Sequence, residues 1–239
     1  MTVLITGGSG ILGTELKKVF SNVITPTREE LDICDEKSVF DFFKKEDIEL
    51  VIHAAATTKI RFCEENRELA MNVNVNGTMN LVNAIIELKK NARFIYISTA
   101  CVFDGHSGMY KESSIPYPEN FYALTKLLGE YEVKKIKNHL IVRTNFVSKQ
   151  KWPYPKAFTD RFGTYLFANQ VAKGLRDVEK ANLEGFVHIV GNKKISMFEL
   201  AKMTTPEILP MTIKEYSGSR LTMDMTLDTE CWKKYSINL

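Results

Sequence analysis

The stretch Met1-Thr-Val-Leu-Ile-Thr-Gly-Gly-Ser-Gly-Ile-Leu-Gly13 decides how the rest of the chain is interpreted. Its apolar residues Val3 to Ile5 predict a short buried strand, and the amphipathic residues from Leu12 onward predict a helix. Glycines between them allow a tight turn and the close approach of a ligand. Free N–H groups and the helix dipole favour an anion at such a strand–helix turn, so the stretch predicts a phosphate site. The residues expected to contact a dinucleotide here are Gly7, Ser9, Gly10, Ile11, Leu12 and Gly13.

Composition excludes several classes of protein. The chain has 239 residues, 44% of them hydrophobic and 26% charged, as in a globular domain. The net charge is +3 without a dense Lys/Arg block, which argues against nucleic acid as a partner. No apolar run reaches the length of a membrane span, so we expect no membrane association. The scattered cysteines form no C-x-x-C pair and predict reduced thiols, no metal site and a cytoplasmic location.

The end of the second predicted strand, residues 22–25, indicates which dinucleotide is preferred. An NAD-binding fold often carries an acidic residue there, which holds the ribose hydroxyls. This chain has none at that position, and Arg28 follows shortly after. Because a basic residue can accept a 2′-phosphate, we expect NADPH as the cofactor, with NADH as the alternative.

A third predicted strand, residues 49–53, ends in small residues that leave room for a ligand across the sheet edge. We expect Ala54, Ala55 and Ala56 to lie under the cofactor, and His53 to be structural.

Thr99, Tyr122 and Lys126 carry the groups that a carbonyl reductase needs. The four-residue spacing places Tyr122 and Lys126 on one helix face. A neighbouring ammonium lowers the pKa of a phenol, which can then exchange a proton with a substrate alcohol. Thr99 ends the predicted strand 93–99 and supplies a second hydrogen bond. The pair Tyr131 and Lys135 has the same spacing but lies about two and a half turns further, on the opposite helix face. We choose Tyr122 and Lys126 because they open the helix after a proline-rich loop and the strand 93–99, and expect the other pair to face solvent.

These motifs jointly resemble the extended short-chain dehydrogenase/reductases, and in particular the dTDP-4-dehydrorhamnose reductase (RmlD-like) family. The resemblance covers most of the chain and depends on the Thr6-Gly7 turn, the segment 98–105, Tyr122 and Lys126, and 142–144. It implies an NADPH-dependent reduction at C4 of a 4-keto-6-deoxy nucleotide sugar, and a homodimer. It also implies that Asp32 and Ile33 edge the adenine ring. The residue pattern independently predicts that Asp35 caps a helix over 36–45, and both can hold because they use different aspartates. The helix predicted over 63–86 then carries Asn74, which ties it to the active-site strands.

Departures from the family pattern leave two alternatives open. The family usually has Thr-Asp-Tyr where this chain has Thr99-Ala100-Cys101, which puts the identity of the substrate in doubt. Cys101 stands where an epimerase-reductase carries an acid/base cysteine, although a packed thiol is favoured. The β-subunit of methionine adenosyltransferase is similar to this family, so a non-catalytic NADP-binding regulator is the other alternative.

Residues 145–169 interleave aromatic and basic side chains, which suit a nucleotide base and its diphosphate. The expected substrate-binding residues are Ala100, Cys101, Asn145, Trp152 and Lys156. Altogether we expect an α/β doubly wound parallel sheet, the NAD(P)-binding Rossmann fold. Residues 1–145 would form it, with about 165–192 completing the sheet. Residues 146–164 and 193–239 would form a small substrate-binding lobe, in which Ser196 and Glu199 form a capping box that opens another helix.

Overall fold

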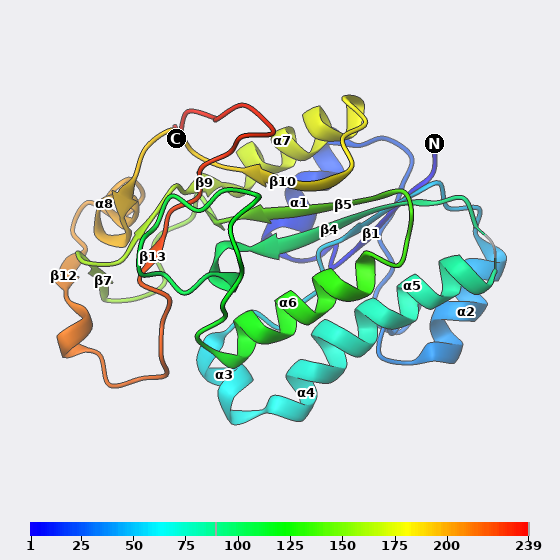
Figure 1. Ribbon diagram of the computed structural model, residues 1–239, viewed down its shortest axis with the longest axis horizontal. Coiled ribbons are helices and arrows are strands. Elements are labelled where there is room, and N and C mark those ends of the chain that lie inside the picture. Colours follow the sequence, from blue (N-terminus) through cyan, green and yellow to red (C-terminus); the bar gives the residue numbers. More distant parts are fainter. Residues whose placement is uncertain (89, 239) are drawn as a thin grey trace.

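The structure, a computed structural model, describes residues 1–88 and 90–238. Its centre is a parallel sheet of six strands in the order β10-β5-β4-β3-β1-β2 (Figure 1). The strands are mostly apolar and buried, as expected where helices cover both faces. They are β1 (Val3–Thr6), β2 (Val23–Ile24), β3 (Leu50–His53), β4 (Arg93–Thr99), β5 (His139–Thr144) and β10 (Gly185–Ile189). Lys89 and Leu239, which fall inside the predicted domain ranges, lie outside the described residues.

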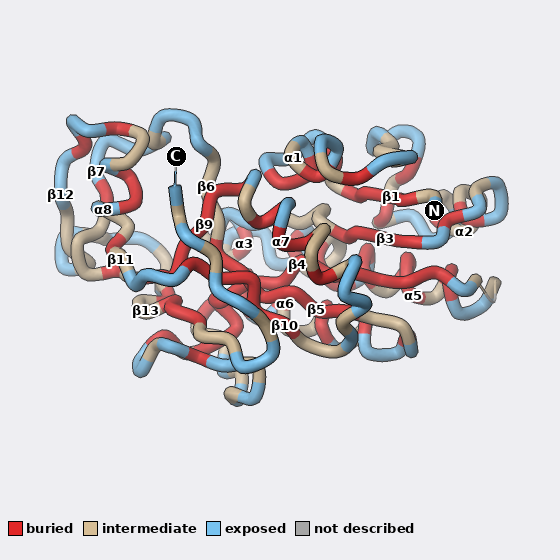
Figure 2. The backbone as a smooth tube through the Cα atoms, turned by 90° about the horizontal axis from the view of Figure 1, so that it is seen from above, coloured by how far each residue is buried: buried red, intermediate tan, exposed pale blue. Residues whose placement is uncertain are grey.

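Helices lie on both faces of this sheet, and Figure 2 shows the strands as the buried layer between them. Side chains alternate along β1, so Val3 and Ile5 pack into one core and Leu4 into the other. The first core includes α1 (Ile11–Val19) and α7 (Ala168–Lys180). The second includes α2 (Glu36–Lys45), α5 (Gly77–Glu87) and α6 (Phe121–Val133). The predicted doubly wound α/β fold is confirmed.

The strand order reverses beside β1, which has β2 on one side and β3 on the other. In this register Thr6 lies opposite His53 at the carboxyl ends of the two strands. Ligands of open α/β sheets bind in the crevice outside such a switch point. The glycine turn after β1 and the small residues after β3 therefore meet at the edge where a ligand is expected.

Local capping signals account for two helix starts. The Asp35 side chain accepts a hydrogen bond from the Lys37 N–H at 2.9 Å and caps α2. Ser196 and Glu199 form the expected capping box at the start of α8 (Met197–Lys202).

The single helix predicted over residues 63–86 is wrong, because the chain is divided there. It forms α3 (Ile60–Glu65), α4 (Arg67–Met71), a π-helical turn η1 (Asn72–Asn76) and α5. Asn66 leaves helical geometry with φ −131° and ψ 60°, and its side chain donates to the Phe62 carbonyl at 3.0 Å. Such a side-chain bond offers the backbone an alternative to continuing the helix, and apolar periodicity does not reveal it.

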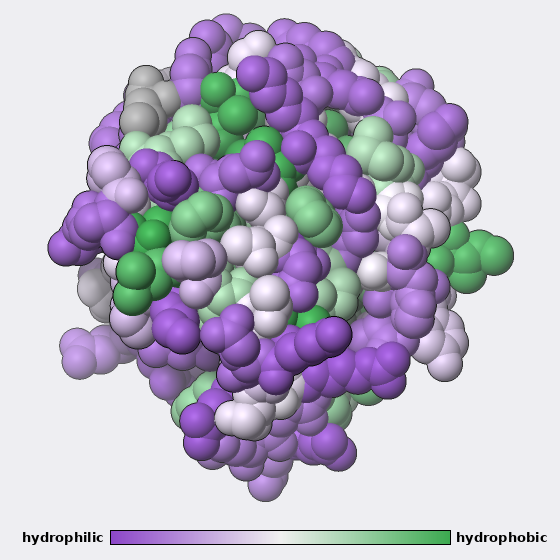
Figure 3. Space-filling model, turned by 90° about the vertical axis from the view of Figure 1, so that its left-hand side faces the viewer, coloured by the Kyte–Doolittle hydropathy of each residue, from purple (hydrophilic) through white to green (hydrophobic). Residues whose placement is uncertain are grey.

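Short strands gather near the carboxyl ends of the main sheet, where β7, β12, β13 and α8 lie at the left of Figure 1. The pairs are β6 (Phe146–Val147) with β9 (Leu166–Phe167), and β7 (Lys156–Phe158) with β12 (Leu209–Met211). A three-stranded sheet places β8 (Phe162–Gly163) between β11 (Ile195–Ser196) and β13 (Asp224–Met225). The short helices η2 (Ala100–Val102) and η3 (Ile213–Glu215) complete the described elements. This side of the molecule presents hydrophilic residues with smaller apolar groups between them (Figure 3).

Candidate active site

The glycine turn is packed tightly against the chain that follows β3. Gly7 has φ +71°, and a Cβ on it would lie 2.8 Å from the backbone nitrogen of Ala55. A Cβ on Gly13 would collide with the carbonyl oxygen of Gly7. Gly10 precedes α1 and provides no side-chain cap for its first N–H groups. The turn therefore presents uncapped backbone donors at a helix N-terminus, which is the chemistry that binds a phosphate.

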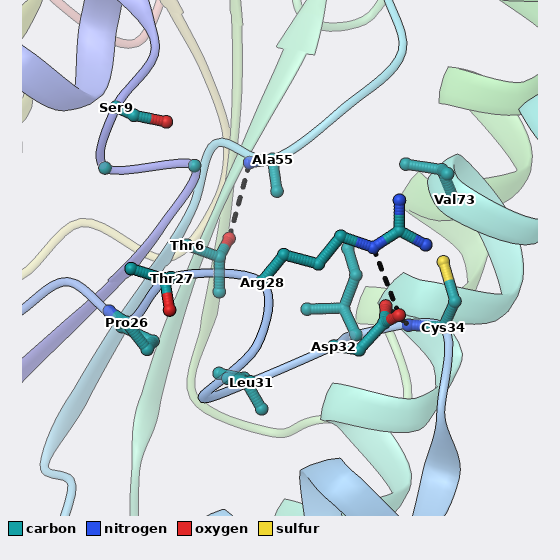
Figure 4. A pocket seen from close by; sticks show the side chains of 13 residues that line it. Thr6, Ser9, Pro26, Thr27, Arg28, Leu31, Asp32, Cys34, Ala55 and Val73 are labelled. Carbon is teal, nitrogen blue, oxygen red and sulfur yellow. Dashed lines mark hydrogen bonds and ion pairs between the residues drawn. The ribbon is translucent and has the colours of Figure 1, made fainter.

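A cavity of about 220 Å³ opens beside this turn and contains several of the predicted cofactor residues (Figure 4). Arg28 extends across it, and its Nε lies 3.1 Å from an Asp32 carboxylate oxygen. The Asp32 carboxylate also accepts from the Cys34 N–H at 3.0 Å. The Arg28 side chain is 74% exposed, so its remaining guanidinium donors can reach a ligand. The lining includes Thr6, Gly7, Ser9, Arg28, Asp32, Ile33 and Ala55.

The three predicted catalytic residues are buried around the carboxyl end of β4 and the start of α6. Thr99 ends β4, and its hydroxyl accepts from the Cys101 N–H at 3.1 Å. Asn120 caps α6 by accepting from the Ala123 N–H at 2.9 Å, which places Tyr122 in the first turn. Burial raises the pKa of Tyr122 far above its ordinary value, and the nearby Thr99 hydroxyl acts in the opposite direction. Thr99 and Tyr122 are therefore neighbours, as a shared reacting oxygen requires.

Lys126 is 3% exposed, and its ammonium lies 4.0 Å above the centre of the Tyr96 ring. Burial lowers the pKa of Lys126 to about 7, although the Glu130 carboxylate acts in the opposite direction. The expected lowering of the phenol pKa by this lysine is not seen, because burial dominates at Tyr122. This contact with Tyr96 was not predicted from the sequence. An aromatic residue in the middle of the strand 93–99, which packs against the helix of Lys126, is the sequence feature that could have indicated it.

His53 connects this group of residues to the glycine turn. Its Nδ1 lies 2.6 Å from the Thr6 hydroxyl, and its Nε2 lies 3.0 Å from the Thr78 hydroxyl. Burial lowers the pKa of His53 to about 3, and the charge of Lys126 lowers it further. A neutral, doubly hydrogen-bonded histidine suits the structural role that the sequence suggested. The Tyr96 ring that Lys126 contacts has its centre 5.6 Å from the centre of the His53 ring, and His53 in turn bonds Thr6 at the start of the turn.

Asn74 joins the chain after β3 to the first turn of α6. Its side chain accepts from the Thr57 N–H at 2.8 Å and donates to the Thr57 carbonyl at 2.9 Å. It also donates to the Thr125 hydroxyl at 2.9 Å, and that hydroxyl donates to the Tyr122 carbonyl at 2.7 Å. Asn74 therefore holds the backbone of Tyr122 through a buried network.

An ion pair behind the site was not assigned a role from the sequence. Arg143 on β5 forms two hydrogen bonds to Glu130 on α6, at 2.9 and 2.7 Å. The Ser98 hydroxyl donates to the same carboxylate at 2.5 Å. Both ionic side chains are at most 3% exposed. Arg143, a charged residue in an otherwise apolar strand, is the sequence feature that could have indicated this pair. The pair and Ser98 together hold α6 against β4 and β5.

The second tyrosine–lysine pair lies at the surface. Tyr131 is 56% exposed, and Lys135, just beyond the end of α6, pairs with Glu132 at 2.6 Å. Within residues 1–88 and 90–238, no group of His, Cys, Asp and Glu is arranged to hold a metal ion. No helix in this part of the chain is long and apolar enough to cross a membrane.

The sequence matches the family model for the RmlD substrate binding domain over residues 1–212. The chain belongs to this family. It is 33% identical over 163 residues to a probable low-salt glycan biosynthesis reductase of Haloferax volcanii, covering 62% of this chain and 54% of that protein. It is 36% identical over 141 residues to methionine adenosyltransferase 2 subunit beta of Xenopus laevis, covering 54% and 42%. The chain thus spans about half the length of these two curated relatives.

A solved structure matches over a longer range. The dTDP-4-dehydrorhamnose reductase of Bacillus anthracis, in complex with NADP, is 25% identical and superposes with a TM-score of 0.87. The match covers 95% of this chain and 91% of that chain. The RmlD-like family expected from the sequence is therefore confirmed, together with its Rossmann-like fold.

The predicted substrate residues of this RmlD-family chain divide into two groups. Cys101 is buried with its Sγ 3.4 Å from the Met225 sulfur, and Asn145 donates to the Met225 carbonyl at 2.7 Å. Ala100 is buried in the same cluster as Tyr122. Trp152 packs at the edge of that cluster, and its indole N–H donates to the Lys156 carbonyl at 3.3 Å. Lys156 lies on the outer strand β7 with its Nζ 3.5 Å from Glu215, so its charge already has a partner.

Proposed function

We propose that this chain is an NADPH-dependent reductase of a 4-keto-6-deoxy nucleotide sugar. The observation that carries the proposal is the grouping of buried Thr99, Tyr122 and Lys126 at the carboxyl end of β4, on the same edge of the sheet as the glycine turn after β1. The turn, the uncapped start of α1 and Arg28 fit a dinucleotide with a 2′-phosphate. The NADP complex of the Bacillus anthracis reductase supports the same cofactor here.

NADPH, when bound, supplies the hydride for C4 of the sugar. Tyr122 donates the proton that converts the C4 alkoxide to an alcohol, and the Thr99 hydroxyl donates a hydrogen bond to the same oxygen. Lys126 titrates close to neutrality, so its protonated form can stabilise the phenolate that Tyr122 becomes. The burial of all three residues strengthens these interactions, because water competes less.

The test uses NADPH with a panel of 4-keto nucleotide sugars and follows the loss of NADPH absorbance. Tyr122→Phe should lower turnover at least about 100-fold, since it removes a general acid, and should change NADPH affinity less than about twofold. Tyr131→Phe is the matched control, because it alters an exposed tyrosine with the same spacing to a lysine. Unchanged turnover in Tyr122→Phe would remove this residue from the mechanism.

A second candidate is a non-catalytic NADP-binding regulator. The similarity to methionine adenosyltransferase 2 subunit beta favours it. Stable co-purification with a synthetase, together with no NADPH oxidation on any sugar of the panel, would support this candidate instead.

An epimerase-reductase has less support from the site. It needs Cys101 as an acid/base group, and the Cys101 thiol contacts the uncharged sulfur of Met225. Solvent deuterium should therefore not enter C3 or C5 of the sugar. Exchange that is lost in Cys101→Ser would favour the epimerase-reductase.

The homodimer and the cytoplasmic location remain predictions from the sequence. Sedimentation equilibrium of the purified chain tests the first, and fractionation of the source cells tests the second.

A further inference from the structure

Arg161 is a buried cation to which the function proposed above assigns no role. It immediately precedes β8 and is 8% exposed. Its Nε donates to the Thr222 carbonyl at 2.9 Å. Among residues 1–88 and 90–238, its two terminal nitrogens find hydrogen-bond acceptors only in the sulfurs of Met197 and Met225, at 3.2 and 3.3 Å. Thioether sulfur is a weak acceptor, so most of the five donors of this guanidinium lack a strong partner.

The two acidic residues nearest to Arg161, Asp160 beside it in the sequence and Asp224 on the paired strand β13, form hydrogen bonds or ion pairs with other residues. The Asp160 carboxylate accepts from the Ile213 N–H at 3.0 Å. The Asp224 carboxylate lies 2.5 Å from the Lys194 ammonium and accepts from the Thr226 hydroxyl at 2.6 Å. Among the described residues, no carboxylate lies within ion-pair distance of Arg161. Buried charges are normally paired with an opposite charge. Arg161 has no such partner here, and an anionic ligand could provide it.

Arg143 shows how the same fold treats an arginine with a structural role. It is also buried, at 3% exposed, and the Glu130 carboxylate holds it with two hydrogen bonds. Arg161 is buried in the same way but has no carboxylate partner among the described residues. It lies on the side of the site where the substrate-binding residues are expected.

Tyr165 provides a second donor in the same place. It is 3% exposed, and its hydroxyl is buried without a hydrogen-bond partner among the described residues. Its ring lies over Gly163, where a Cβ would collide with it. Burial raises the pKa of Tyr165 and keeps it a neutral donor, while the nearby charge of Arg161 acts in the opposite direction. Arg161 contacts Met225, and Tyr165 belongs to the same apolar cluster as Met225.

Both groups border the reacting centre. The Met225 sulfur that contacts Arg161 lies 3.4 Å from the Cys101 sulfur, and the Cys101 N–H donates to Thr99. Tyr165, Cys101 and Tyr122 belong to one apolar cluster. A ligand group held by Arg161 would thus lie beside the apolar cluster that contains Cys101 and Tyr122.

We propose that Arg161 and the Tyr165 hydroxyl form a buried oxyanion site, which binds a phosphoryl or carboxylate group of the substrate beside Thr99 and Tyr122. The proposal rests on the proposed function only in placing the substrate at Thr99. A diphosphate on C1 of the sugar would satisfy the site in the substrate proposed above, whereas a carboxylate would satisfy it only in a uronic acid rather than a 6-deoxy sugar.

The test measures anion binding by thermal unfolding and calorimetry, with no turnover involved. The probes are dTDP and UDP for the phosphoryl source, and D-glucuronate for the carboxylate source, at constant ionic strength. Arg161→Met should weaken the bound anion at least about tenfold. Without ligand it should melt no lower than the wild type, because the substitution removes an unpaired charge from an apolar site. Arg176→Met is the control, since Arg176 lies on α7 and already pairs with Glu179.

If Arg161→Met loses affinity for dTDP and UDP, the site binds a phosphoryl group; if it loses affinity for D-glucuronate, the site binds a carboxylate. Tyr165→Phe, which keeps the ring, should weaken the same probe several-fold and guards against misfolding of the arginine variant. Wild-type protein that binds neither class of anion would overturn the proposal, as would Arg161→Met with wild-type affinity for both. A failed reductase assay with intact anion binding would refute the proposed function alone.

Discussion

Glu130→Gln tests whether the buried ion pair behind the site sets both the stability of the protein and the charge of Lys126. The substitution leaves the Arg143 guanidinium buried without its carboxylate. Breaking such a pair typically costs about 3–5 kcal/mol of unfolding free energy, because the remaining charge is uncompensated. We expect the lower end, about 3 kcal/mol, since the glutamine oxygen can still accept one hydrogen bond. For a chain of this size the melting temperature should then fall by roughly 6–12 °C.

Urea unfolding followed by circular dichroism measures this free energy. Glu132→Gln is the matched control two residues further along the same helix, where the pair with Lys135 is partly exposed. An exposed pair contributes about 1 kcal/mol at most, so the control should unfold close to the wild type. The double variant Glu130→Gln, Arg143→Met should recover part of the loss, because it removes the charge that the single variant strands.

Glu130→Gln should also act on Lys126. The Glu130 carboxylate raises the pKa of Lys126, so its removal should bring this pKa below the wild-type value of about 7. NMR titration of the lysine side chain measures the shift. Equal stabilities of Glu130→Gln and Glu132→Gln, with no change at Lys126, would refute the reasoning.

Two further predictions concern pH and the cofactor. Burial lowers the folded-state pKa of Lys126 from 10.5 to about 7. The unfolded chain therefore holds one more proton within that window, and stability should rise with pH by up to about 1.4 kcal/mol per unit. Lys126→Met should lack this rise in urea unfolding, and identical pH profiles would contradict the prediction. Arg28→Ala should raise the Kd for NADPH about 10–100-fold and leave the Kd for NADH nearly unchanged, because it removes a charge-assisted phosphate contact. Fluorescence titration measures both constants, Lys37→Ala on the outer face of α2 is the control, and equal weakening of both cofactors would argue against a 2′-phosphate contact.

The Rossmann half was predictable because its elements carry local signals. The apolar run 93–99 coincides with β4, and the cap at Asp35 marks the start of α2. Glycine spacing located the turn after β1, since no other residue fits there. Helix geometry shows that Tyr122 and Tyr131 cannot line one pocket, and the sequence favours Tyr122 because it opens the helix that follows the strand 93–99. The two tyrosines are indeed buried and exposed respectively.

The second half was less predictable because non-local pairing determines it. The three-residue strands β7 and β12 pair although they are far apart in the sequence, and neither is long enough to show a period. Arg161 looked like one of several basic residues in an aromatic segment. Only the packing of Met197 and Met225 around it shows that this cation is buried while Lys156 is not.

The π-helical turn at Asn72–Asn76 has an evolutionary consequence. Such a turn contains one residue more than an α-helix would use, and it commonly occurs at functional sites. Deleting one residue there would restore regular winding but rotate Asn74 away from Thr57 and Thr125. Exposed positions of the turn, such as Asn76, can accept substitutions. We therefore expect homologous chains to vary in residue type along this segment while keeping its length constant.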